Sequence, residues 1–297
     1  MPANHPHLLI AATANLAAAE PANPWLRAAF QLTGVQTLAC PADGAREALQ
    51  NCGGADLLLV PCLPGGAVAR LIPELAGLCR GVLLLPDAAQ DARQAEKLRR
   101  ALRQARLHLY VAHHLSFLPA VNRVAELTTA GLLGELREIE LELALDAPPP
   151  RRRQEALTLL ALLTGSDLPE NAGAAIPAAA AAAGAASQLR TPHGTAIALR
   201  LRSPQTGAAD SLRLRVAGSA GHVTAAWDAG AAAAGQPPVH FALGDGHTRD
   251  FPVPAGEPHR LCLAAALLCL ARGETLDRLD PKPWARLLPP PASGLAP

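Results

Sequence analysis

Four side chains that could do chemistry stand just after strand-like apolar runs in the first 114 residues: Cys62, Asp87, His113 and His114. An imidazole can bind a ligand or titrate near neutral pH, and a thiol becomes a nucleophile where a nearby cation lowers its pKa. Each also has a structural interpretation: a small buried thiol, a loop carboxylate, or a histidine bonded to a backbone carbonyl. Residue type alone leaves both interpretations open.

Glu155 and Thr158 form a second candidate pair, in a helix expected at 154–163. A glutamate whose pKa is raised by burial could act as a general base. The helix follows the run Arg151-Arg152-Arg153, however, and next to it the charged, structural form of Glu155 is expected. The arginine run itself is interpreted as a solvated helix edge.

The elements that must position the first group alternate between strand-like and helical patterns, which predicts a doubly wound parallel sheet covered by helices. The expected strands are 7–12, 35–39, 56–61, 81–85 and 107–112. The expected helices are 24–32, 66–79 and 91–105, the last with Asp91 as its N-cap. In such a sheet, ligands bind at the carboxyl ends of the strands, where His113 and His114 would lie.

After residue 113 the pattern changes to consecutive strands without long crossovers, which predicts an open, mainly antiparallel sheet. The expected strands are 135–145, 195–202, 211–217, 222–227 and 239–243, and the expected helices are 119–130, 154–163 and 258–271. The alanine-rich stretch 171–187 has no interpretable pattern. We therefore expect three parts: a domain at 1–113, a second domain of helices and sheet at 114–280, and a proline-rich tail at 281–297.

Composition excludes several classes of protein. The formal net charge is +1 with both signs interspersed, so no electrostatic field favours nucleic acid or an anionic membrane. No window offers the roughly 20 uninterrupted apolar residues of a membrane helix, and no signal peptide is recognised. The six cysteines form no C-x-x-C pair, so neither a metal site nor a disulfide is expected. A cytoplasmic location is expected.

The order of elements resembles the Gfo/Idh/MocA family of NAD(P)-dependent oxidoreductases. Phe117, Pro119, the turn Gly131-Leu132-Leu133-Gly134 and the long strand after it match the family in order and spacing. Gly218-Ser219-Ala220-Gly221 resembles the family's glycine turn between two sheet strands. The resemblance spans roughly residues 7 to 280. It implies a Rossmann-like dinucleotide-binding domain, a C-terminal sheet domain and hydride transfer with NAD(P).

The cofactor motif departs from the family pattern. A G-x-G-x-x-G fingerprint needs glycine at its first two positions, so that the backbone can turn tightly and approach the pyrophosphate. Here the sequence reads Ala12-x-Ala14-x-x-Ala17, and the following helix is expected to start near Pro24. We therefore expect no cofactor or weakly bound NAD(P). The remaining candidate contacts are weak ones: Ala12, Ala14, Asn15 and Cys62.

The catalytic motifs depart as well. The family's Glu-Lys-Pro aligns with the stretch at Leu85 and Pro86, and the chain has only two lysines, Lys97 and Lys282. The family's His-x-x-Asp pair aligns with Glu155 and Thr158, and its hinge arginine aligns with Leu115 or Ser116. The remaining candidates for a catalytic cleft are His113, His114, Asp87, Glu155 and Thr158.

Two functions follow from this pattern. In the first, the chain keeps the fold without redox chemistry and serves as a ligand-binding or partner subunit. It would form a homo- or hetero-oligomer through the C-terminal sheet, whose apolar face has to be covered, and an active enzyme is a possible partner.

In the second, the chain is a divergent NAD(P)-dependent oxidoreductase for a small sugar-like or carbonyl or imine substrate. Glu155 or His114 would then donate or accept the proton. Dinucleotide binding discriminates between the two functions, because only the enzyme requires it.

Overall fold

The structure is a computed structural model. It describes residues 7–12, 24–41, 44–60, 65–89, 91–165, 168–169, 172, 175–176, 184–205, 208–233, 235–254, 256–274, 276, 279–280 and 288. Contacts divide these residues into two compact units. Unit 1 holds the residues up to His114 together with those from Glu257 to Asp280, and unit 2 holds Leu115–Gly256 together with Leu288.

Unit 1 contains a parallel sheet, sheet A, with the strand order β2-β1-β3-β4-β5. Its strands are β1 (His7–Ala12), β2 (Gln36–Pro41), β3 (Ala55–Val60), β4 (Cys79–Leu84) and β5 (His108–Val111). Its crossover helices are α1 (Pro24–Phe30), α2 (Ala45–Asn51), α3 (Gly65–Leu75) and α4 (Ala92–Gln104). The predicted doubly wound sheet is confirmed, and α2 was not predicted.

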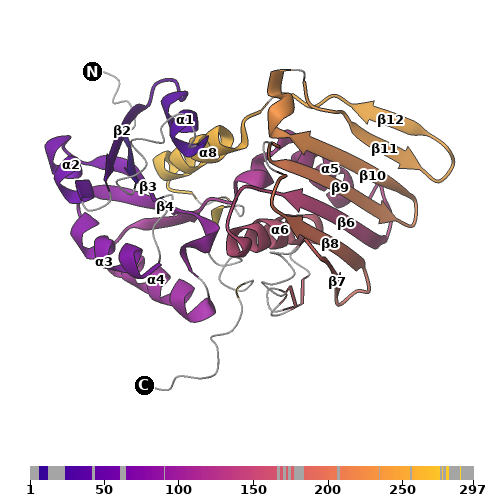
Figure 1. The fold of residues 1–297 in the computed structure, drawn as a ribbon, viewed down its shortest axis with the longest axis horizontal. Helices are drawn as coiled ribbons and strands as arrows, with labels where there is room; N and C mark the ends of the chain where they lie inside the picture. The colour runs from indigo at the N-terminus through magenta and orange to yellow at the C-terminus, as the bar shows by residue number, and fades with distance from the viewer. Residues whose placement is uncertain are drawn as a thin grey trace. The chain divides into compact units, whose positions relative to one another are not determined.

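Local sequence explains these elements. Leu57, Leu58 and Leu59 on β3 are all buried, as expected for a strand covered on both faces. Helix α4 begins where Asp91 accepts a hydrogen bond from the backbone nitrogen of Gln94 at 2.8 Å, so the predicted N-cap is confirmed. Figure 1 shows α1 on one side of the strands and α3 and α4 on the other.

The last helix, α8 (Pro258–Arg272), belongs to unit 1, where it contacts α1, β3 and β4. Near its end, the carbonyl of Leu270 accepts a hydrogen bond from Arg80 of β4 at 3.3 Å. The observed division therefore differs from the predicted domain at 114–280. A helix with a buried apolar face can return to either sheet, and nothing in its own sequence states which.

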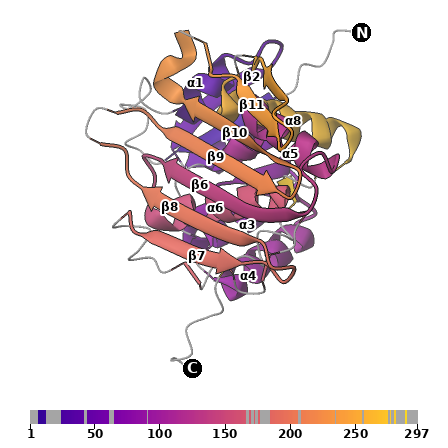
Figure 2. The ribbon, with the colours of Figure 1, turned by 90° about the vertical axis from the view of Figure 1, so that its right-hand side faces the viewer.

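Unit 2 contains a mainly antiparallel sheet, sheet B, with the order β12-β11-β10-β9-β6-β8-β7 and one parallel pair, β6 with β8. Its strands are β6 (Leu136–Ala144), β7 (Ala186–Arg190), β8 (Ala196–Arg202), β9 (Ser211–Gly218), β10 (Gly221–Asp228), β11 (Val239–Leu243) and β12 (Thr248–Phe251). Helices α5 (Pro119–Thr129) and α6 (Pro149–Leu163) lie behind the strands in Figure 2. The predicted open sheet is confirmed, with β7 and β12 added.

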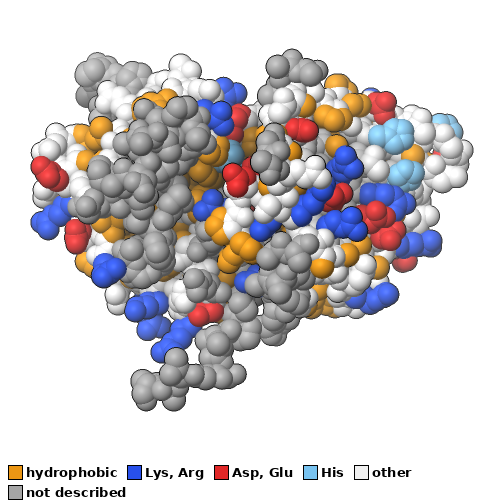
Figure 3. Space-filling view, viewed as in Figure 1, with side chains coloured by type: hydrophobic (Ala, Val, Ile, Leu, Met, Phe, Trp, Pro, Cys, Tyr) orange, Lys and Arg blue, Asp and Glu red, His pale blue; other side chains and the backbone are white. Residues whose placement is uncertain are grey.

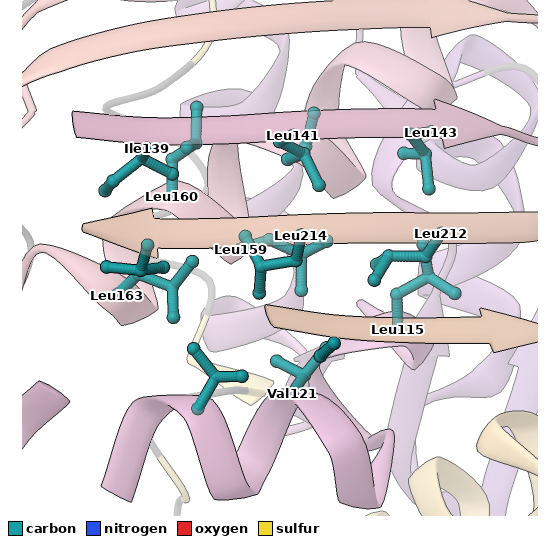
Figure 4. Packing of buried hydrophobic residues seen from close by; sticks show 14 of the residues in the cluster. Leu115, Val121, Ile139, Leu141, Leu143, Leu159, Leu160, Leu163, Leu212 and Leu214 are labelled. Atoms are coloured by element: carbon teal, nitrogen blue, oxygen red, sulfur yellow. The ribbon is translucent and has the colours of Figure 1, made fainter. Parts of the chain in front are cut away.

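One face of sheet B is apolar and is covered within unit 2. Ile139, Leu141 and Leu143 of β6 and Leu212 and Leu214 of β9 pack with Val121 of α5 and with leucines of α6, as Figure 4 shows. The expectation that a partner must cover the apolar face is therefore wrong, because α5 and α6 cover it. The opposite face, called here the open face, carries charged side chains of β6, β8 and β9.

The two glycine turns of the second domain meet. The backbone nitrogens of Ser219 and Ala220 donate to the carbonyls of Glu135 and Leu133 at 2.8 and 2.9 Å. A Cβ on Gly218 would lie 2.1 Å from the oxygen of Leu133. Glycine is thus required here by close backbone approach, and both turns serve the sheet framework.

Helix α6 starts at Pro149, five residues before the predicted start at 154. Pro149 and Pro150 occupy the first helical positions, where a missing N–H costs little, so the proline run is part of the helix and not only a loop. The interpretation of the arginine run as a solvated edge is wrong for Arg152, which is 3% exposed.

Within the described ranges, no helix combines the length and hydrophobicity that a membrane span requires.

Candidate functional site

An aromatic cluster lies at the carboxyl ends of the strands of sheet A, and we call it the Trp–His cluster: Trp25, His114 and His259. The rings of His114 and His259 stack with centroids 4.2 Å apart and planes inclined by 17°. Trp25 meets His259 edge-on at 4.7 Å and His114 at 5.8 Å. The three residues are 4%, 6% and 7% exposed.

The topology of unit 1 explains why these three residues meet. His114 follows β5, where the nitrogen of Ala112 still bonds to Leu84 of β4 at 2.7 Å. Helix α1 leads from the carboxyl end of β1 back to the start of β2, so Trp25, in its first turn, lies at the carboxyl edge. Helix α8 starts at the same edge, because its end contacts the start of β4.

Glu257 fixes the orientation of His259. Its carboxylate caps α8 by accepting from the backbone nitrogens of His259 and Arg260 at 3.1 and 2.6 Å. The same carboxylate accepts from Nδ1 of the His259 ring at 2.5 Å. Burial acts to raise the pKa of Glu257, but the bonds and charge of His259 outweigh it, so the pKa lies below its ordinary value. Glu257 is therefore held ionised beside a buried imidazole.

The other predicted candidates of unit 1 are only partly described. His113 is buried, and its backbone nitrogen donates to the carbonyl of Val111 at 3.1 Å. Asp87 lies in a single 3-10 turn, Pro86–Ala88, and its side chain is outside the described residues. Ala14, Asn15 and Cys62 are also outside them, and of Ala12 only the backbone is described, paired with Pro41.

Glu155 and Thr158 belong to unit 2, on α6, whereas His113 and His114 belong to unit 1. Glu155 is buried and Thr158 is half-buried. Leu115 and Ser116, which align with the hinge arginine, are both fully buried, and Leu115 packs in the core of unit 2. In the described part of the chain, no group of three or more histidine, cysteine or acidic side chains is arranged to hold a metal ion.

Sequence reasoning missed Trp25, Glu257 and His259. The signal for Glu257 was available, since Glu257-Pro258 is an acidic N-cap followed by proline at the first helical position. No comparable signal was available for His259, because its partner His114 is far away in sequence and helix α8 was expected in the second domain.

Comparison with solved structures identifies the fold. A single-residue variant of a 3-ketoreductase from Actinomadura kijaniata, in complex with TDP-benzene and NADP, matches with a TM-score of 0.70 and 19% identity over 96% of each chain. A protein from Desulfitobacterium hafniense, proposed to be an NADPH-dependent oxidoreductase, matches with a TM-score of 0.72 and 10% identity over 96% of this chain and 93% of that one. No protein-family model matches the chain, and no curated protein matches it.

The chain has the Gfo/Idh/MocA fold. A proposed myo-inositol dehydrogenase from Sinorhizobium meliloti matches as well, with a TM-score of 0.64 and 15% identity over 95% of this chain and 94% of that one. At these identities the likeness establishes the fold and not the activity.

The Gfo/Idh/MocA fold implies a dinucleotide, and the described residues at its position do not fit one. Helix α1 has only seven residues and begins with Pro24, which has no N–H to offer a phosphate. The next side chain, Trp25, is buried in the Trp–His cluster. Strand β2 ends in Cys40 and Pro41, where a ribose would need an acidic residue. We therefore derive no chemical step through NAD(P).

The position of the fold's lysine does not fit either. Leu85 is buried, and Pro86 opens the 3-10 turn that follows β4. Lys97, the lysine of the described residues, lies on the exposed side of α4. Neither Leu85 nor Pro86 can donate a proton.

Proposed function

We propose that this chain is a pseudo-oxidoreductase, which keeps the Gfo/Idh/MocA fold but has lost hydride transfer and acts as a binding or partner subunit beside an active enzyme or in its own oligomer. The observation that supports this proposal is the start of α1, where the fold would bind a pyrophosphate. Pro24 and the buried Trp25 stand there, with the rings of His114 and His259 against the indole.

An alternative is a divergent NAD(P)-dependent oxidoreductase for a small sugar-like or carbonyl or imine substrate. The observation that favours it is the bonded pair of Glu257 and His259, which could hold a proton beside the stacked ring of His114. Acid–base groups alone transfer no hydride, so this alternative still requires a dinucleotide that the described residues do not fit.

Hydride transfer is tested directly by mixing the chain at high concentration with NADH or NADPH and a series of sugar-like, carbonyl and imine compounds. We expect the near-ultraviolet absorbance of the reduced nicotinamide to fall no faster than in buffer. Turnover with any compound would support the alternative, and the variants His114→Ala and Glu155→Gln would then show which residue handles the proton.

We further propose that a second copy of this chain docks on the open face of sheet B. The acidic row Glu138, Glu140 and Glu142 of β6 lies between the arginines of β8 and β9. Within the chain, Arg215 pairs with Glu138 and Glu140 at 2.9 and 2.8 Å. Figure 3 shows positive and negative side chains mixed over these strands.

A hollow of about 660 Å³ on the open face is lined by these charges and by Pro237 and Pro238. A twofold axis could set the acidic row of one copy against a basic row of the other, which is the self-complementarity that an isologous interface needs. Charge complementarity thus favours a second copy as the occupant.

Reversing one charge on the open face is expected to dissociate this dimer. Arg215→Glu places a fourth carboxylate beside the acidic row, and the twofold axis repeats the repulsion, so we expect the dissociation constant to rise at least about tenfold. Light scattering after size exclusion gives the mass of each variant. The matched control Arg137→Glu changes an exposed arginine of β6 that lies outside the hollow. A wild-type chain that is monomeric at high micromolar concentration would contradict the proposal.

A cytoplasmic location is also proposed. It is supported by the described cysteines, which are reduced: Cys40, Cys52, Cys79, Cys262 and Cys269.

A further inference from the structure

Helix α4 carries a concentration of positive charge that the rest of the chain does not share. Six of the chain's 26 lysines and arginines lie between Arg93 and Arg106, and Glu96 is the one acidic residue of that stretch. The whole chain carries only +1, so the residues outside this stretch are together net negative. Figure 3 shows positive side chains gathered along the edge of unit 1 where Figure 1 places α4.

Three of these cations form one row on the outside of the helix, which we call the α4 cation row: Arg93, Lys97 and Arg100. They stand four and three residues apart, so they share one face of the helix. All three side chains are exposed. The residues that α4 buries in unit 1 lie on the opposite face. The row therefore points away from sheet A and toward solvent.

No described residue neutralises the α4 cation row. Its three members form no ion pair within the described part of the chain. The carboxylate of Glu96 is already shared by two other arginines, Arg99 at 2.7 Å and Arg103 at 3.0 Å. On the open face of sheet B, by contrast, arginines are paired with glutamates. The row thus keeps its full charge at the surface.

The stability of the helix does not explain this row. Like charges three or four residues apart on a helix repel one another, and opposite charges at the same spacing attract. A glutamate in place of Lys97 would face Arg93 on one side and Arg100 on the other. Three cations kept in a row against this repulsion indicate a role outside the helix, and such a surface attracts an anionic partner.

The surroundings of the row favour one class of anionic partner. Proteins that bind single-stranded nucleic acid stack its bases on aromatic side chains, and residues 93–106 include no aromatic residue. A helix that binds a membrane surface inserts its apolar face, whereas the apolar face of α4 is buried in unit 1. A helix with a row of carboxylates does match, because it repeats the same spacing over the about 10 Å between Arg93 and Arg100.

We propose that the α4 cation row docks a helical segment of a partner protein that carries a matching row of carboxylates. Each cation of the row would donate a charge-assisted hydrogen bond to one carboxylate. The contact is exposed, so its affinity is modest and falls as the salt concentration rises. The site belongs to unit 1 alone. It requires neither the proposed dimer on sheet B nor the proposed loss of hydride transfer.

The test is fluorescence anisotropy of a labelled, alanine-rich helical peptide with glutamates at the same four-and-three spacing, titrated with the full chain at low salt. We expect saturable binding that is at least about tenfold tighter than that of the same peptide with glutamines in place of the glutamates. Equal binding of the two peptides, or no binding of either, would overturn the proposal.

A short DNA duplex and vesicles that contain phosphatidylserine are titrated in parallel, because phosphate groups could also meet three exposed cations. We expect both to bind more weakly than the glutamate peptide. Tighter binding of the duplex or the vesicles would show that the row recognises phosphate, and it would rule out the acidic protein segment as the intended partner.

Charge reversal locates the binding on α4. The double variant Lys97→Glu with Arg100→Glu should raise the dissociation constant of the glutamate peptide at least about tenfold. The matched control Arg46→Glu with Arg272→Glu makes the same change of net charge at exposed arginines of α2 and α8, and it should bind like the wild type. Equal losses in the two double variants would contradict the site, because net charge alone would then explain the binding.

Thermal unfolding separates a lost contact from a lost fold. The reversed row should keep the wild-type midpoint, because its side chains take no part in the packing of α4. If that variant does not fold, Lys97→Gln with Arg100→Gln decides, since it removes two charges of the row and adds none. Full binding of the glutamate peptide by a folded variant of either kind would overturn the proposal.

Discussion

Replacement of Trp25 by alanine is expected to lower the free energy of unfolding by about 3–5 kcal/mol. The indole is 4% exposed and packs edge-on against the imidazoles of His114 and His259. Its removal opens a cavity where α1, α8 and the end of β5 meet, and aromatic pairs contribute about 0.5–1.5 kcal/mol beyond their burial. Urea unfolding followed by circular dichroism measures the change.

Trp25→Phe is the control, because it keeps an aromatic ring in the cluster and should lose clearly less stability than Trp25→Ala. A loss below about 1 kcal/mol for Trp25→Ala would be typical of a surface site. That result would mean that the start of α1 is not packed as described, and that the region could open to a dinucleotide.

Gly218→Ala is expected to destabilise unit 2 by about 3 kcal/mol or more. The added Cβ would lie 2.1 Å from the oxygen of Leu133 and 2.9 Å from the oxygen of Glu135, both backbone atoms that hold the neighbouring turn. Because backbone cannot move aside as a flexible side chain can, the two turns must separate. Thermal and urea unfolding report the loss.

Gly244→Ala is a matched control from the same sheet. Its added Cβ would lie 3.6 Å from the oxygen of Ala220, an ordinary contact, so we expect a change within about 1 kcal/mol. Equal losses in the two variants would contradict the role of close backbone approach at Gly218.

The periodicity of apolar residues in the sequence predicted those helices and strands that bury one regular face. Helix α4 and strands β8 to β11 were placed within one or two residues, because each alternates or repeats its apolar residues at the period of its structure. Helix α2 was missed because only Ala45 and Leu49 are buried. Strands β7 and β12 were missed because they lie at the edges of sheet B and bury almost nothing.

The candidate site could be predicted only in part. The position of His114 at the carboxyl edge of sheet A followed from the order of strands. His259 could not be placed, because pairing of the two imidazoles requires α8 to return to unit 1. The burial of Arg152 could not be predicted either, because it depends on a contact that is distant in sequence: Ser203, at the end of β8, accepts a hydrogen bond from its guanidinium group.

The most direct test of the proposed loss of hydride transfer is thermal unfolding with NAD+, NADH, NADP+ and NADPH at millimolar concentration. A ligand at about 100 times its dissociation constant adds roughly 2.7 kcal/mol of stability, which moves the midpoint of a chain of this size by several degrees. We predict no shift with any of the four, because Pro24 and Trp25 stand where the pyrophosphate would bind. A shift of several degrees with any one of them would contradict the pseudo-oxidoreductase.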